Sequence, residues 1–158
     1  MDKLSSNVYH KEFFMSGLSA IDLLNYVRQN TEAALNGIGM VEGSVKGADL
    51  TSVIADQKSE YARLYSEADA LLRRKHGEAE NMSTLSKMSA TVMGNMKKLT
   101  YQDDRDIADT MITGTVMGIN KLIKHMNEFT GEDKEITSLA SKVIDFEEEC
   151  IEELKPYL

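Results

Sequence analysis

The sequence predicts an all-α protein built as a bundle of four long helices. Apolar residues recur at intervals of three and four over long stretches, which is the period of an amphipathic helix. Ten methionines, one proline and no tryptophan in 158 residues favour helices over β-sheets, because strands prefer aromatic and β-branched residues. Two of the connections between the helical stretches are short and one is long. This spacing predicts two antiparallel hairpins joined by a crossover.

The first hairpin is expected to pair a helix at about 19–46 with one at about 50–76. Ser19 is followed three residues later by Asp22, a variant of the capping box in which each side chain bonds to the other's backbone N–H. The last turn of the second helix contains two arginines, a lysine and a histidine, directly before Gly77. Cations there complement the helix dipole, so the helix should stop at that glycine.

The second hairpin is expected to pair helices at about 101–129 and 133–155. Its first helix contains Gly114 and Gly118, and glycine inside a helix costs roughly 1 kcal/mol relative to alanine. Two glycines four residues apart lie on one helix face and permit another helix to approach closely. The long crossover between the hairpins contains a further amphipathic stretch, which predicts a short helix at about 84–99.

The remaining features limit the domain organisation, partners and cellular location that we expect for this protein. Residues 1–18 are irregular but rich in aromatic side chains, so we expect a docking segment that packs on the bundle or on a partner, with 19–158 as a single bundle domain. The formal charge is −8 and no basic stripe is present, which argues against nucleic acid or an anionic membrane as partner. One cysteine and no long apolar run predict a cytoplasmic protein.

The helix layout resembles that of the ferritin-like four-helix-bundle superfamily over roughly residues 19–157, where a long crossover also joins two hairpins. The runs MITGTVMGI and IEELKPYL are similar to those of small, uncharacterised ferritin-like proteins of bacteria that lack the di-iron ligands. The resemblance implies a ferritin-like fold. Separately from it, we expect the chain to associate with itself, as a homodimer or another homo-oligomer.

The sequence lacks the ligand pattern that a ferritin-like di-iron centre requires. Such a centre takes one Glu from each of two helices and a Glu-x-x-His from each of the other two. The three histidines are preceded, three residues earlier, by Asn, Arg and Leu: they are His10, His76 and His125. The nearest match is Glu147-x-x-Cys150. We therefore predict no cofactor, no metal ligands and no catalytic residues, so the protein is not expected to be an enzyme.

Three polar side chains nevertheless point inward near the middle of the predicted helices. Turning each helix by about 100° per residue places Gln57, Thr115 and Glu147 on apolar faces, and the ferritin-like crossover puts them at one height. Thr31 also points inward, but with this crossover it is displaced along the axis. In a simple up-down-up-down bundle Thr31 would join the layer instead and Gln57 would be displaced. A core threonine can instead bond to the carbonyl four residues earlier, which is the structural alternative for Thr31 and Thr115.

Two functions of different kinds fit these observations. The first is a non-catalytic, metal-free bundle that serves as an interaction or self-association module, with the acidic helix at 133–155 and the aromatic N-terminal segment as contact surfaces. The second is a bundle that binds a small ligand or a single metal ion through the core polar layer of Gln57, Thr115 and Glu147. The missing histidines favour the first function.

Overall fold

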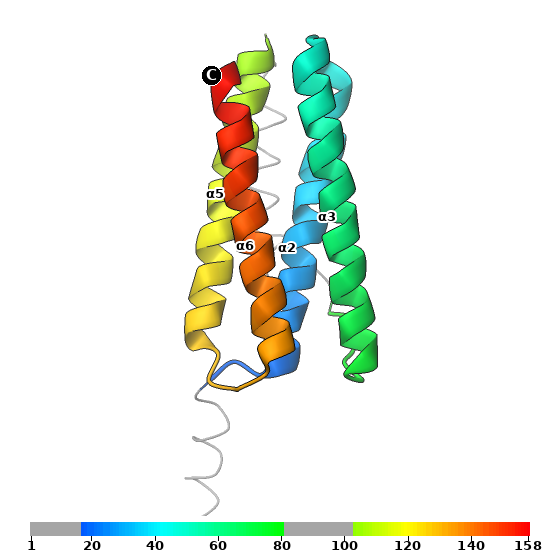
Figure 1. The fold of residues 1–158 in the computed structure, drawn as a ribbon, viewed down its shortest axis with the longest axis vertical. Coiled ribbons are helices and arrows are strands. Elements are labelled where there is room, and N and C mark those ends of the chain that lie inside the picture. Colours follow the sequence, from blue (N-terminus) through cyan, green and yellow to red (C-terminus); the bar gives the residue numbers. More distant parts are fainter. Residues whose placement is uncertain (1–16, 81–102) are drawn as a thin grey trace, which may run out of the picture.

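The computed structural model describes residues 17–80 and 103–158, and these form an all-α four-helix bundle (Figure 1). The four long helices are α2 (Ala20–Val41), α3 (Ala48–Arg74), α5 (Asp104–Glu128) and α6 (Lys134–Leu154). Two short 3-10 turns extend the first and last of them: η1 (Glu42–Ser44) and η2 (Lys155–Tyr157). No β-strand forms within these residues, apart from a single bridge between Leu18 and Phe129.

The helix directions are those of the ferritin-like layout, because α3 and α5 run in the same direction (Figure 1). At one end of the bundle, the backbone N–H groups of Lys46 and Gly47 donate to the Asp104 carboxylate at 2.8 and 2.7 Å. At the other end, the Leu18 N–H donates to the Glu128 carbonyl at 3.1 Å. The end of α3 and the start of α5 therefore lie at opposite ends of the bundle. The helix predicted at 84–99 lies outside the described residues.

The first predicted helix is too long at its C-terminal end. The Ser19 capping box forms as predicted, with the Asp22 N–H donating to the Ser19 hydroxyl at 3.0 Å. The α-helix stops at Val41, however, and gives way to η1 rather than continuing to residue 46. Gly43 and Ser44 are weak helix formers, and Val45 already has extended backbone geometry, so the last predicted turn is lost.

The second helix spans Ala48–Arg74 rather than 50–76, and its end is built differently from the prediction. His76, and not Gly77, has the positive φ, at 55°. The Gly77 N–H bonds to the Leu72 carbonyl and the His76 N–H to the Arg73 carbonyl, which is a Schellman motif. Gly77 is needed for another reason: a Cβ there would stand 2.5 Å from Leu72 Cδ1.

The second hairpin begins each helix one residue after an aspartate. Asp103 caps α5 by accepting from the Asp106 N–H, and Asp133 caps α6 by accepting from the Ile136 N–H. The predicted ranges 101–129 and 133–155 therefore differ from the structure mainly at the start of α5. Of the predicted docking segment at 1–18, only Gly17 and Leu18 belong to the described residues.

The core consists of two apolar clusters stacked along the bundle axis. The first lies toward the end where α2 begins and includes Leu24, Leu64 and Val143. The second lies toward the α2–α3 connection, with Ile54 and Ile107 among its members. Buried polar side chains lie between the two clusters, and the candidate site is there.

Asp104 should be important for stability because it joins the two hairpins. Replacing Asp104 by Ala removes two charge-assisted hydrogen bonds to the α2–α3 connection, and we expect a loss of about 1–2 kcal/mol in the free energy of unfolding. Urea unfolding followed by circular dichroism measures this. Asp56→Ala, on the exposed face of α3, is the matched control and should change stability little. Equal effects of the two substitutions would refute the role of Asp104.

Candidate functional site

The centre of the candidate site is the Glu147 side chain of α6, which is only 1% exposed. The Asn30 amide of α2 donates to Glu147 Oε2 at 3.2 Å. The Tyr61 hydroxyl of α3 donates to Glu147 Oε1 at 3.4 Å. Both donors are neutral groups, so the carboxyl has hydrogen bonds but no cationic partner among the described residues.

Two further side chains complete this layer around the Tyr61 hydroxyl. The Thr115 hydroxyl of α5 and the Cys150 thiol of α6 both lie close enough to influence the Tyr61 pKa. Thr115 also donates to the Met111 carbonyl of its own helix at 2.8 Å. All four long helices therefore contribute a polar side chain to the layer between the two apolar clusters.

Burial keeps this layer uncharged near neutral pH. It raises the pKa of Glu147 to about 8, against the opposing effect of the hydrogen bonds from Asn30 and Tyr61. Burial also raises the pKa of Tyr61 well above its ordinary value, with a further contribution from Glu147. The Cys150 pKa is raised to about 12, first by burial and then by the carboxylates of Glu153 and Glu147. Cys150 is therefore a thiol and not a reactive thiolate.

Gly118 allows α5 to lie directly against this layer. A Cβ at position 118 would stand 2.7 Å from Asn30 Oδ1 and 3.4 Å from Glu147 Oε1. The first distance is shorter than real Cβ contacts allow, so Asn30 would have to move. At Gly114, no atom of the described part of the chain lies within 4 Å of the Cβ position. The close approach predicted for the glycine pair is thus required at Gly118 and not at Gly114.

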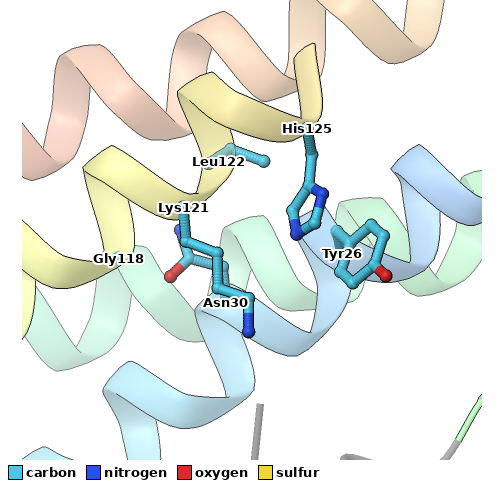
Figure 2. A pocket seen from close by; sticks show the side chains of 6 residues that line it. All are labelled: Tyr26, Asn30, Gly118, Lys121, Leu122 and His125. Atoms are coloured by element: carbon cyan, nitrogen blue, oxygen red, sulfur yellow. The ribbon is translucent and has the colours of Figure 1, made fainter. Parts of the chain in front are cut away.

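A small pocket between α2 and α5 reaches the layer from the side. It has a volume of about 10 Å³ and is lined by Tyr26, Asn30, Gly118, Lys121, Leu122 and His125 (Figure 2). The Tyr26 and His125 rings stack with their centroids 3.5 Å apart. Burial lowers the pKa of His125, and it also lowers the pKa of Lys121. A volume of this size admits about one water molecule.

His125 makes only a weak polar contact in this pocket. Its Nδ1 lies 3.4 Å from Glu128 Oε2, a distance that qualifies as an ion pair if the ring is protonated. Among the residues that the structure describes, no partner meets hydrogen-bond geometry with either ring nitrogen. Burial lowers the pKa of His125 from its ordinary value, so the ring is neutral at pH 7 and its contact with Glu128 is not an ion pair.

The hydrogen bonds of the layer differ from those that the sequence predicted. Gln57 is buried, but its amide donates to the Cys150 carbonyl at 3.3 Å and to Glu153 Oε2 at 2.9 Å, and not to Glu147. Tyr61, one helical turn further along α3, reaches Glu147 instead. The height comparison was therefore wrong by one turn for Gln57.

The α2 member of the layer is Asn30, which the sequence reading missed. Its neighbour Thr31 is buried but bonds within its own helix, with its hydroxyl donating to the Arg28 carbonyl at 2.8 Å. Tyr61 of α3 is likewise absent from the layer that the sequence predicted. The sequence does contain a signal for both residues. Asn30 directly precedes Thr31, and Tyr61 lies one helical turn after Gln57. Each carries a hydrogen-bond donor that can reach a buried carboxylate.

The donor set of this layer does not fit a dinuclear iron centre. Within residues 17–80 and 103–158, no three His, Cys, Asp or Glu side chains lie together in a way that could hold a metal ion. The layer offers one carboxyl, whose raised pKa disfavours the ionised form that a metal requires. The other polar groups at this level are an amide, two hydroxyls and a thiol.

Comparisons with known proteins support the fold alone. No protein-family model matches the sequence, and no curated protein matches it either. Among solved structures, the chain is similar to the bacterioferritin-related protein from Bacteroides fragilis, described as a dodecameric thioferritin of the bacterial domain. The TM-score is 0.63 at 15% identity, covering 87% of this chain and 83% of that one. The ferritin-like bundle predicted from helix layout is thus confirmed as a fold.

Glu147→Gln should stabilise the protein at pH 7 and make its stability less dependent on pH. The folded-state pKa of about 8 lies above the unfolded value, so the folded protein holds the proton more tightly. Stability should fall between about pH 4.5 and pH 8, by at most about 1.4 kcal/mol per pH unit, and level off above that. Gln imitates the protonated carboxyl and removes this decline.

The measurement is urea unfolding of the wild type and the Gln variant at a series of pH values. The two curves should diverge as the pH rises, with the variant the more stable at pH 7 and above. A variant that is less stable at pH 7, or equally dependent on pH, would mean that the ionised carboxylate is the form that the fold uses.

Gly118→Ala and Gly114→Ala form a matched pair on one helix. At position 114 the new methyl group has free space, so alanine should stabilise by up to about 1 kcal/mol through helix propensity. At position 118 it displaces Asn30 from Glu147, and we expect a net loss of about 1–3 kcal/mol. Thermal unfolding of both variants measures this. If both substitutions stabilise the protein, the contact at Gly118 does not constrain the helix.

Proposed function

We propose that this protein is a non-catalytic, metal-free ferritin-like bundle that acts in the cytoplasm by associating with itself or with another protein. The observation that carries the proposal is the chemistry of the mid-bundle layer. Its one carboxyl is held by the neutral donors Asn30 and Tyr61, and a raised pKa keeps it protonated. These groups stabilise the packing between the two core clusters. We therefore expect the protein to function through contacts made by its surface.

The solved structure with the similar fold supports self-association, since that protein is described as a dodecamer. We propose that this chain shares with that protein the tendency to assemble. We do not propose that it shares the iron chemistry that the word thioferritin implies. The layer described above lacks the ligand set that such chemistry needs. A ferritin-like bundle that assembles without binding iron accounts for both observations.

The surface charge narrows the choice of partner. The outward face of α6 is acidic, as predicted, and its exposed members are Asp145, Glu148, Glu149, Glu152 and Glu153. Such a face repels polyanions, so nucleic acid and anionic lipid are unsuitable partners. In the part of the chain that the structure describes, no helix is both long and apolar enough to cross a membrane. The charge of the α6 face therefore favours a protein partner over a polyanion.

The alternative function, binding of a small ligand or a single metal ion at the core layer, has less support. The pocket that reaches Asn30 has a volume of about 10 Å³, too little for an organic ligand. A single metal ion would also need Glu147 ionised, and the two groups that bond to it stabilise the carboxylate too weakly to offset burial.

The direct test is to measure metal content and mass on one preparation of the full chain purified without chelators. We expect no stoichiometric iron, zinc or copper, no ferroxidase activity after addition of ferrous iron, and a light-scattering mass above that of one chain. Two bound irons per chain, or a strictly monomeric protein that also binds a metal, would overturn the proposal.

A further inference from the structure

The outer face of α5 leaves two large hydrophobic side chains in solvent. Val116 is 41% exposed and Ile123 is 39% exposed, and only Leu158 joins them among the large hydrophobic residues of the described part. Seven residues separate them, which is two helical turns, so they lie on the same face. Thr113 and Asn120 are exposed between and beside them. The centre of this face carries no charge.

Charges of opposite sign flank this uncharged centre. Asp109 is exposed on the N-terminal side and Lys124 on the C-terminal side. Within the described residues neither forms an ion pair in its own chain, so both remain available to a partner. Asp109 lies seven residues before Val116, and Lys124 lies eight residues after it. The two charges are therefore almost equally distant from the middle of the face.

We propose that the face formed by Asp109, Thr113, Val116, Asn120, Ile123 and Lys124 binds the same face of a second copy, with the two α5 helices antiparallel about a two-fold axis. This inference rests on the proposed function and identifies its contact surface. In an antiparallel pair centred beside Val116, Asp109 of each chain lies at the height of Lys124 of the other. A parallel pair would bring like charges together.

The charge distribution of the molecule also favours a second copy at this face over one at α6. The exposed side of α6 carries five carboxylates that would repel an identical face. The α5 face instead offers uncharged side chains at its centre and one ion pair at each end. α5 has 25 residues and is therefore about 37 Å long, enough for a two-helix contact of several turns.

The first experiment disrupts the apolar centre. Val116→Glu with Ile123→Glu places four like charges in the contact, with the two at position 116 beside the two-fold axis, and we expect self-association to weaken by about tenfold or more. Both positions are exposed, so the bundle should keep its helical content, which circular dichroism verifies. Leu158→Glu is the matched control, because Leu158 is 50% exposed but lies outside the face. Sedimentation velocity over a range of concentrations measures the association.

The second experiment exchanges the flanking charges. Asp109→Lys or Lys124→Asp alone should weaken association, because each creates two repulsive pairs across the axis. The double exchange should restore it. Mixing the two single variants should also restore it, since one chain then carries both cations and the other both anions. The loss in each single variant and its recovery in the double exchange together identify an antiparallel contact, because in a parallel pair position 109 faces position 109, and the wild type, both single variants and the double exchange would all keep two like-charge pairs. The double exchange leaves the net charge unchanged, so its recovery does not follow from a general effect of net charge.

The outcomes separate this surface from the proposed function. A wild-type chain that self-associates, with the glutamate double variant associating equally well, would overturn the α5 face and leave the proposed function standing. Failure of the mixed single variants to associate would overturn the antiparallel arrangement. A wild-type chain that stays monomeric at high micromolar concentration and takes up a stoichiometric metal ion would overturn both.

Discussion

A carboxyl group buried between two apolar clusters is the constraint on which the middle of this bundle depends. Glu147 has no cationic partner among the described residues, so its burial is tolerable only if donors reach it and the proton stays on. Asn30 and Tyr61 supply the donors from two other helices. Gly118 on the fourth helix supplies the space, because a side chain there would collide with Asn30. The buried carboxyl of Glu147 thus determines which residue each of the other three long helices carries at this level.

This constraint explains why a bundle with a ferritin-like layout need not carry ferritin chemistry. Metal centres in such bundles depend on several carboxylates and histidines that converge at mid-height, and their mutual repulsion is relieved by the metal charge. Here the same level is filled by hydrogen-bonding groups that are neutral together. The layer holds the four helices in one register. On the outside of the bundle, α5 presents a face with an uncharged centre and α6 presents an acidic face.

Much of this arrangement could be predicted from the sequence, for identifiable reasons. The long apolar periodicity and the lengths of the connections predicted the four helices and their directions. The angular position of Glu147 around its helix predicted that the side chain is buried. Helix ends were less accurate where capping depended on local geometry, as at Val41 and His76. Asn30 and Tyr61 were missed because a helical wheel shows only the polarity of each residue and its angle around one helix. Which donor reaches a buried carboxyl depends on side-chain length and on helix register across the bundle, and neither is visible in one helix.

The central claim is that Glu147 is protonated in the folded protein at neutral pH. Infrared difference spectroscopy between the wild type and Glu147→Gln measures this directly, because a protonated carboxyl and a carboxylate absorb in separate regions. The account predicts a protonated carboxyl band at pH 7 that is present in the wild type, absent from the variant, and lost as the pH rises through about 8. A carboxylate band at pH 6 with no protonated signal would contradict it, and would mean that the buried layer holds a charge after all.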